Sequence, residues 1–281
     1  MAEILKGKDV ADAMLASMKQ DVETLKAKGI EPTLGIIRIG EREDDISYEK
    51  GATSRCKSAG VAVKSVVLPA DANQQALINA IQDANNDKNV HGVLLFRPLP
   101  KHLNDEEARA ALLPQKDMDG ITDGPLAGVF ANTPNGFPPC TAEACMEILS
   151  HFKIDPTGKR VVVVGRSLVI GRPVAMMLMH QNGTVTICHT RTKDLPGVIR
   201  EAEIVIVAAG QPESVGKDSF KEGQIVIDVG IHVKEDGKMC GDVIFAEADP
   251  IVAAITPVPG GVGTVTTSVL VRHVIQAAMK L

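Results

Sequence analysis

Apolar residues along the chain recur in two alternating patterns, one typical of amphipathic helices and one of short buried strands. The first apolar positions are three or four residues apart and predict a helix that Gly29 ends; they are Val10, Met14, Met18, Val22 and Leu25. The pattern then predicts a strand at 33–40, a helix at 45–59 before Gly60, a strand at 61–69, a helix at 71–84 and a strand at 90–96. This alternation predicts a parallel sheet with helices on its faces.

A stretch dense in Pro, Gly, Asn and Asp separates this series from a second one. Residues 114–140 predict a loop or hinge, and loops of this length usually carry function. Thr141 is expected to cap a helix over 142–152. The second series comprises a strand at 160–165, a helix at 172–181, strands at 184–189, 203–210 and 224–230, and a last helix at 264–280.

The two series predict an α/β fold with two domains. One is expected to comprise 1–118 together with 264–281, and the other 119–263. A chain of 281 residues is long enough for two compact domains. With 44% hydrophobic residues but no Trp and one Tyr, the core must consist of aliphatic side chains. The net charge of −5 gives no broad basic surface, so we expect a small-molecule ligand and no nucleic acid.

The five cysteines are scattered and form no CxxC pair or zinc-type Cys/His spacing. This pattern predicts reduced thiols and no bound metal, as in a reducing compartment. The first residues carry charges throughout and lack the apolar segment of a signal peptide, and no apolar run is long enough to span a bilayer. We therefore expect a cytoplasmic protein with no membrane partner.

The segment VVVVGRSLVIGRP (161–173) places a buried strand, a glycine-led turn and a helix start in succession. Gly165 allows a sharp turn, and Gly171 allows the helix to approach the strand. Pro173 suits the first helical turn, whose free N–H groups can bind phosphates. The glycines do not reproduce GxGxxG, so an ordinary turn between strand and helix is the alternative.

The end of the next predicted strand indicates which dinucleotide binds. NAD sites usually carry an acid there for the ribose 2′-hydroxyl. Here the strand is followed by His189, Thr190, Arg191, Thr192 and Lys193, which offer no acid and two cations for a 2′-phosphate. We expect NADP; a solvated basic loop is the alternative.

Three segments have plain readings when taken singly: SYEK (47–50) on a helix, KDMDG (116–120) as a turn, and PVPGGVG (257–263) as a turn. In this order and spacing, however, they resemble the methylenetetrahydrofolate dehydrogenase/cyclohydrolase family. The resemblance covers the whole chain and includes DDISYEKG, PLP (98–100), PQKDMDG, PPCT, VVVVGRSLVIGRPVAMML, TVTICHTRT, VIDVGIH, GDV and TPVPGGVG. The GRSxxxGxP and PVPGGVG segments are the most specific of these.

The resemblance implies a folate-binding first domain, an NADP-binding second domain, a cleft between them and a homodimer. Members oxidise 5,10-methylenetetrahydrofolate to the methenyl form with NADP in one-carbon metabolism, and most hydrolyse the product to 10-formyltetrahydrofolate. Tetrahydrofolate derivatives are thus the expected substrates. The resemblance implies catalytic roles for Tyr48 and Asp119. It places Phe96, Pro98, Leu99, Pro259, Gly260 and Gly261 at the substrate as well, and Gly165, Arg166, Ser167, Gly171, Thr190, Arg191 and Ile231 at the cofactor.

The chain departs from the family pattern at two positions. The family has a Lys four residues after the Tyr, on the same helix face, and it handles protons during hydrolysis; here Ala52 stands there. The family has a Gln where this chain has Phe96. Lys50 is two positions from Tyr48, roughly 200° around the helix, and is expected to point away. We hypothesise weak or absent cyclohydrolase activity; the alternative is a bifunctional enzyme in which Arg97 or an ordered water replaces the lysine.

Two other function classes remain as rivals. A shikimate-type dehydrogenase has the same fold, but would normally carry a Lys and Asp pair for the hydroxyl proton. A non-catalytic nucleotide-binding scaffold has no reason to keep both the 165–171 and the 257–263 segments. Retention on an adenosine-phosphate column would separate an enzyme from a scaffold.

Overall fold

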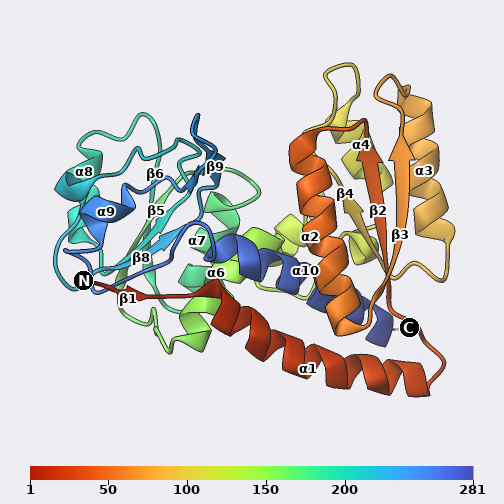
Figure 1. Ribbon diagram of the computed structural model, residues 1–281, viewed down its shortest axis with the longest axis horizontal. Coiled ribbons are helices and arrows are strands. Elements are labelled where there is room, and N and C mark those ends of the chain that lie inside the picture. Colours follow the sequence, from red (N-terminus) through yellow and green to blue (C-terminus); the bar gives the residue numbers. More distant parts are fainter. Residues whose placement is uncertain (281) are drawn as a thin grey trace. The chain divides into compact units, whose positions relative to one another are not determined.

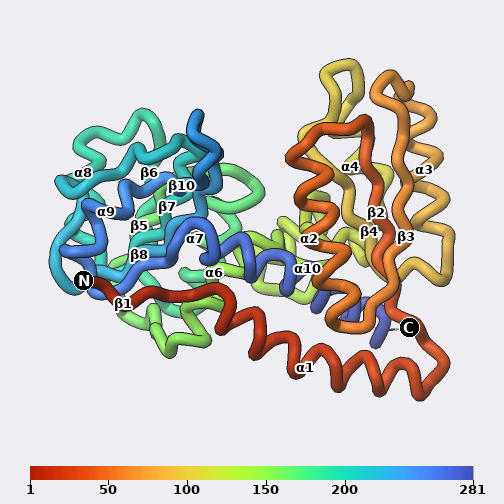
Figure 2. The backbone as a smooth tube through the Cα atoms, in the orientation of Figure 1, coloured from red at the N-terminus to blue at the C-terminus, as the bar shows by residue number. Residues whose placement is uncertain are grey.

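A computed structural model describes residues 1–280 of the chain (Figures 1 and 2). The described residues form two compact units. One unit, here the large-sheet unit, comprises Met1–Asp12 and Thr141–Thr266. The other, the small-sheet unit, comprises Ala13–Cys140 and the residues from Thr267 onward. The fold is α/β in both units, as the alternating pattern predicted.

These units differ from the domain division expected from the sequence at three places, one of which is residues 264–266, which belong with the large sheet. Residues 1–12 belong with the large sheet, because β1 (Glu3–Ile4) pairs in parallel with β11 (Ala254–Ile255). Residues 119–140 belong with the small sheet, where a Cβ at Gly120 would lie 2.5 Å from the Pro139 nitrogen. The unit boundaries fall inside α1 (Gly7–Ala27), after the first residue of α6 (Cys140–His151), and inside α10 (Val262–Met279).

The small-sheet unit is built on three parallel strands within the described residues, in the order β3-β2-β4. Their bounds are β2 (Thr33–Ile39), β3 (Ala62–Leu68) and β4 (Gly92–Leu95). The helices of this unit are α2 (Glu43–Ala59), α3 (Gln74–Asn86), α4 (Asp105–Ala111) and α5 (Asp123–Ala131), with a 3-10 turn at Pro114–Lys116. The helix predicted at 45–59 is confirmed and ends at Gly60, whose φ is +82°.

Alternation along β2 divides its side chains between two helix layers. Ile37 and Ile39 belong to a buried cluster with α3 and α4. Arg38, between them, points to the other face, where its Nε donates to Glu49 of α2 at 2.7 Å. Other members of the α3/α4 cluster are Leu77, Ile81, Val93, Leu95, Leu103, Ala108 and Leu112.

The stretch expected to be a loop or hinge contains a helix, so that expectation was wrong over Asp123–Ala131. The two glycines and the proline of α5 suggested a loop, but close packing uses one of them. A Cβ at Gly128 would lie 2.8 Å from the carbonyl oxygen of Asn135. The next helix, α6, spans Cys140–His151, so Thr141 lies in its first turn rather than at its N-cap.

The large-sheet unit holds a six-stranded parallel sheet within the described residues, in the order β1-β11-β8-β7-β5-β6. Its longer strands are β5 (Arg160–Val164), β6 (Thr184–Cys188), β7 (Ile204–Val207) and β8 (Ile225–Asp228). The other elements are α7 (Gly171–His180), α8 (Leu195–Glu201), α9 (Phe245–Ala248), a 3-10 turn at Lys217–Ser219, and a hairpin of β9 (His232–Val233) and β10 (Met239–Cys240). The strand order reverses between β5 and β7, the usual ligand edge of such sheets.

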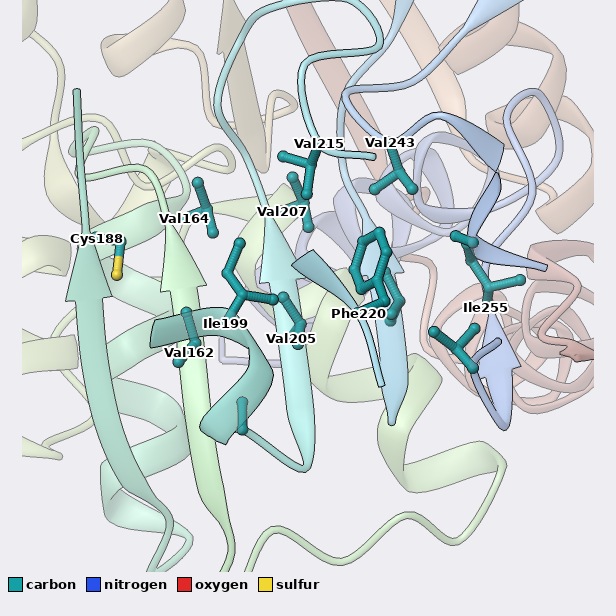
Figure 3. Packing of buried hydrophobic residues seen from close by; sticks show 14 residues of the cluster. Val162, Val164, Cys188, Ile199, Val205, Val207, Val215, Phe220, Val243 and Ile255 are labelled. Carbon is teal, nitrogen blue, oxygen red and sulfur yellow. The ribbon is translucent and has the colours of Figure 1, made fainter. Parts of the chain in front are cut away.

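One face of this sheet is covered by an aliphatic core (Figure 3). Val164, Val205 and Val207 of neighbouring strands share this face, and Ile199 of α8 and Phe220 lie over them. No helix within residues 1–280 is long and apolar enough to cross a membrane.

Candidate active site

The functional residues expected in the large-sheet unit lie after the carboxyl ends of its parallel strands. Gly165 follows β5, His189 follows β6, and Ile231 comes three residues after β8. Because these strands are parallel, their carboxyl ends share one edge of the sheet. Tertiary structure thus brings residues far apart in sequence to the edge where α/β sheets bind dinucleotides.

The turn from Gly165 to Gly171 leaves no room for side chains at either glycine. Gly165 has a φ of +123°, and a Cβ there would lie 2.1 Å from the Ala208 carbonyl oxygen. A Cβ at Gly171 would lie 2.2 Å from the carbonyl oxygen of Gly165. Ser167 Oγ accepts the Ile170 N–H at 3.1 Å, and Arg166 and Ser167 are exposed. The turn is therefore compact and opens to solvent before α7, as a phosphate-binding turn requires.

The basic turn after β6 is ordered by its own side chains. His189 Nδ1 accepts the N–H of Arg191 at 3.1 Å, and Thr192 Oγ1 accepts the N–H of His189 at 2.9 Å. Thr190, Arg191 and Lys193 are exposed. The turn offers a fixed backbone, two cations and no acid, which suits a 2′-phosphate better than a 2′-hydroxyl.

Ile231 and the 257–263 loop lie together in the large-sheet unit. A Cβ at Gly263 would be 2.8 Å from the Ile231 Cδ1, and Ile231 is 53% exposed. The Gly260 carbonyl oxygen accepts the N–H of Gly7 at 2.8 Å. Pro259 and Gly260 are exposed, whereas Gly261 is buried with its Cβ position 2.4 Å from the Pro257 carbonyl oxygen.

Tyr48 and Phe96 contact each other in the small-sheet unit. Tyr48 lies in α2 and Phe96 follows β4, and their ring centroids are 5.7 Å apart at 79°. Ala52, one turn after Tyr48 on the same helix, is fully buried, and Phe96 is 8% exposed. Lys50 is exposed. The positions at which the resemblance implies Lys and Gln thus carry buried apolar side chains near Tyr48.

Asp119 is half-buried, and the pKa of its carboxyl is raised. Burial first, and then the charge of Asp117, raises the pKa of Asp119 from 3.8 to about 6. Burial also raises the pKa of Asp117, whose carboxylate accepts the Thr122 N–H at 2.7 Å. Burial, with the charges of Asp119 and Cys140, raises the pKa of Tyr48 well above 10. Tyr48 therefore stays protonated at neutral pH, whereas Asp119 changes its protonation state near pH 6.

Two residues that carried no assigned role from the sequence hold Asp119 in place. The Cys140 thiol and backbone N–H both donate to the Asp119 carboxylate. His273 Nδ1 donates to the carbonyl oxygen of Met118 at 2.8 Å, and His273 is 1% exposed. Cys140 belongs to the PPCT motif, which contributed to the family resemblance but indicated no role for the cysteine. The sequence gave no indication of a role for His273, because a histidine in an apolar helix is most simply interpreted as a core residue.

Arg97 and Leu99, which follow Phe96 in the sequence, make contacts within the small-sheet unit. Arg97 makes a two-point ion pair with Asp105 of α4, at 2.5 Å from Nε and 2.7 Å from Nη2. Although burial opposes it, the guanidiniums of Arg97 and Arg109 hold the pKa of Asp105 below its usual value. Pro98 is exposed and follows a cis peptide bond, while Leu99 packs against the α3/α4 cluster.

Family models match nearly all of the chain in two parts. Residues 5–119 match the catalytic domain of tetrahydrofolate dehydrogenase/cyclohydrolase, and residues 139–281 match its NAD(P)-binding domain. The chain belongs to the tetrahydrofolate dehydrogenase/cyclohydrolase family. The resemblance found in its motifs is therefore confirmed, and it is an enzyme of this family with an NAD(P)-binding domain.

Relatives and solved structures of the tetrahydrofolate dehydrogenase/cyclohydrolase family span the chain almost end to end. The bifunctional protein FolD of Carboxydothermus hydrogenoformans is 51% identical, covering 99% of this chain and 97% of its own length. That of Clostridioides difficile is 46% identical, covering 98% and 96%. The FolD structure from Campylobacter jejuni has a TM-score of 0.97 at 36% identity, covering 100% and 99%. The Trypanosoma brucei enzyme, complexed with NADP and an inhibitor, has a TM-score of 0.94 at 34% identity, covering 99% and 98%.

The residues of the family's NAD(P)-binding domain fit the dinucleotide in this structure. The test is steric and electrostatic. Two glycines stand where a Cβ would strike backbone, residues 166–169 before α7 are exposed, and the basic turn contains no acid. Among the described residues no three His, Cys, Asp or Glu side chains form a cluster that could hold a metal ion.

Proposed function

We propose that the chain oxidises 5,10-methylenetetrahydrofolate to 5,10-methenyltetrahydrofolate with NADP and has little or no cyclohydrolase activity. The observation that carries the second part is the apolar contact of Tyr48 and Phe96 beside buried Ala52. A relative named bifunctional is 51% identical to this chain, so overall similarity does not support a loss of hydrolysis and this part of the proposal rests on positions 52 and 96 alone.

Oxidation makes modest demands on the protein. The methylene carbon lies between two ring nitrogens, whose lone pairs would stabilise the methenyl cation formed when that carbon loses a hydride. NADP, when bound, would supply the hydride acceptor. Tyr48 would stack against the folate, and the Asp119 carboxylate would accept hydrogen bonds from its aminopyrimidine ring. The negative charge of Asp119 would also favour a cationic pterin. Gly165, Arg166, Ser167 and Gly171 would hold the cofactor phosphates, Thr190 and Arg191 the 2′-phosphate, and the Ile231 backbone the carboxamide.

Hydrolysis makes a different demand, because a water must be activated and a proton moved. Ala52 and Phe96 can neither donate nor accept a proton. Tyr48 has a raised pKa and cannot serve as a base near neutral pH. An apolar wall of this kind also disfavours an ordered water, which needs two to four polar partners.

The alternative is a bifunctional enzyme in which Arg97 or an ordered water replaces the lysine. Arg97 is a poor substitute, since a guanidinium stays protonated and this one is held by Asp105 at two points. A water held by Tyr48 and Asp119 would be the remaining route.

Two assays on the purified chain test the proposal. NADPH formation is followed with methylenetetrahydrofolate, and the decay of methenyltetrahydrofolate absorbance is followed without cofactor. We expect NADPH formation together with a methenyl decay equal to the buffer-catalysed rate. Enzyme-dependent decay as fast as NADPH formation would overturn the loss of hydrolysis, and absence of NADPH formation would overturn the dehydrogenase itself.

The proposal extends to the cellular setting. A dehydrogenase without hydrolysis releases the methenyl compound, so a separate hydrolase must consume it in the same compartment. We propose a cytoplasmic homodimer that acts in one-carbon metabolism and binds neither nucleic acid nor membrane. Sedimentation of the purified chain tests the dimer.

A further inference from the structure

Two aspartates buried at the carboxyl edge of the large sheet have no part in the chemistry above. Asp228 ends β8 and is 3% exposed, and Asp242 follows β10 and is fully buried. The Asp228 carboxylate accepts backbone N–H groups of Gly230, Asp242 and Val243, each at 3.0 Å. Backbone donors thus compensate this carboxylate, which forms no ion pair with a side-chain cation among residues 1–280.

Asp242 joins a different pair of segments. Its carboxylate accepts the N–H groups of Gly210 and Gln211 at 3.0 Å each. Its Oδ1 lies 2.8 Å from His232 Nε2 in β9. The loop that follows β7 is therefore bound to the hairpin that follows β8.

The carboxylates of Asp228 and Asp242 fit only because the residues beside them are glycines without a Cβ. A Cβ at Gly230 would lie 2.4 Å from the Asp242 backbone nitrogen and 2.5 Å from its Cγ. A Cβ at Gly241 would lie 1.9 Å from the Asp228 Oδ2. The local backbone is thus built around both acids, independently of the hydrogen bonds.

The segments bound by the pair are those that adjoin the expected cofactor residues. Gly210 comes two residues after Ala208, whose carbonyl oxygen lies so close to Gly165 that a Cβ there would be 2.1 Å from it. Gly230 adjoins Ile231. The Asp228 N–H donates to Thr256 Oγ1 at 2.8 Å, directly before the 257–263 loop. One buried pair therefore contacts three loops at the ligand edge of the sheet.

We propose that Asp228 and Asp242 are positioning residues whose carboxylates hold the loops at 208–211 and 229–231 in the arrangement that binds the dinucleotide. They act through the backbone and need not touch the ligand. The proposal rests on the assignment of NADP under the proposed function.

The test uses Asp228→Asn and Asp242→Asn, which preserve shape but turn an amide nitrogen toward a backbone N–H. We expect the NADPH dissociation constant, measured by fluorescence titration, to rise about tenfold, as an unpaired buried donor would cause. Both variants keep the Asp228 backbone N–H that bonds Thr256, so the 257–263 loop expected at the substrate is retained and the KM for methylenetetrahydrofolate should change less than about twofold. Hydrogen exchange at Gly210 and Gln211 should accelerate in Asp242→Asn.

Gln224→Ala is the matched control. Gln224 is fully buried just before β8, at the opposite end of that strand, and donates to Ile199 and Ala202 carbonyl oxygens at 2.7 and 3.0 Å. It should lower the melting temperature without changing NADPH binding. If the aspartate variants do the same as this control, the positioning role is overturned.

A milder pair of variants covers the case in which the aspartate variants do not fold. His232→Leu removes the bond to Asp242, and His232→Gln can restore it. NADPH binding weakened by leucine and recovered by glutamine supports the proposal, whereas equal binding overturns it. Failure of the unmodified chain to bind NADPH would overturn the proposed cofactor instead.

Discussion

Phe96 meets Tyr48 edge to face, with ring centroids 5.7 Å apart, in the place where the family pattern has a glutamine. Edge-to-face contacts of this kind contribute roughly 0.5–1.5 kcal/mol beyond the buried area. Ala52 lies one helical turn from Tyr48 and is fully buried. The two positions at which the resemblance implies polar partners therefore carry packed apolar side chains.

Restoring both polar groups should restore hydrolysis. We expect Ala52→Lys with Phe96→Gln to raise enzyme-dependent methenyl decay by about 100-fold, the usual contribution of one acid–base group. Either change alone should give much less, because each group positions the other. The measurement is methenyl absorbance decay above the buffer rate.

The control for this double variant is Thr53→Lys with Phe96→Gln. Thr53 is exposed on the same helix, one residue further along. It adds the same charge but points it roughly 100° away. Equal hydrolysis by both double variants, or none by the Ala52 variant when folded, would contradict the assignment of position 52.

Arg97→Gln tests whether the arginine replaces the missing lysine. The ion pair with Asp105 is partly exposed, so its loss should cost about 1 kcal/mol or less of unfolding free energy. We expect no change in methenyl decay and little change in dehydrogenase kcat. A decay rate that drops with Arg97→Gln would support the bifunctional alternative.

Asp119 should make folate binding depend on pH. With a pKa of about 6, its carboxylate becomes protonated as the pH falls through that value and loses acceptor capacity. We expect kcat/KM for methylenetetrahydrofolate to fall below about pH 6. The same limb in the pH profile of Asp119→Asn would show that another group causes it.

The same shift has a stability consequence of opposite direction. Because the pKa of Asp119 is higher folded than its value of 3.8, the folded state prefers the protonated carboxyl. Its stabilisation is complete below about pH 4 and is lost as the pH rises through 6. Asp119→Asn should therefore raise the unfolding free energy by about 1–3 kcal/mol near pH 8, with partial exposure reducing the effect. Denaturant unfolding of the unmodified chain and of Asp119→Asn, near pH 4 and near pH 8, measures the difference in unfolding free energy.

Arg191 should set the preference between the two dinucleotides. It is exposed in a turn without acids, where a guanidinium can bind a 2′-phosphate at two points. Arg191→Ala should raise the KM for NADP about tenfold or more and leave that for NAD nearly unchanged. Lys217→Ala, exposed in the same unit, is the control, and an equal effect on both cofactors would contradict the role.

Much of the fold follows from local pattern. Strand and helix alternation, the end of α2 at Gly60 and the compact turn at Gly165 were all predictable, because each depends on residues near in sequence. The helix α5 was missed because its glycines and proline mimic a loop until Gly128 is seen against Asn135. The pairing of β1 with β11 was missed because a two-residue strand has no detectable period.

The sequence by itself determined the family and the parallel α/β class, and it led to the hypothesis that Ala52 and Phe96 replace a Lys and a Gln, since motif spacing and helix register carry these. Only the tertiary structure decided what surrounds them: that Phe96 contacts Tyr48, that Arg97 is held by Asp105, and that His273 supports Asp119 from the last helix. It also revealed the buried Asp228 and Asp242 pair. These relations depend on which distant segments share a face or an edge, and burial, which decides ionisation and packing, exists only once they meet.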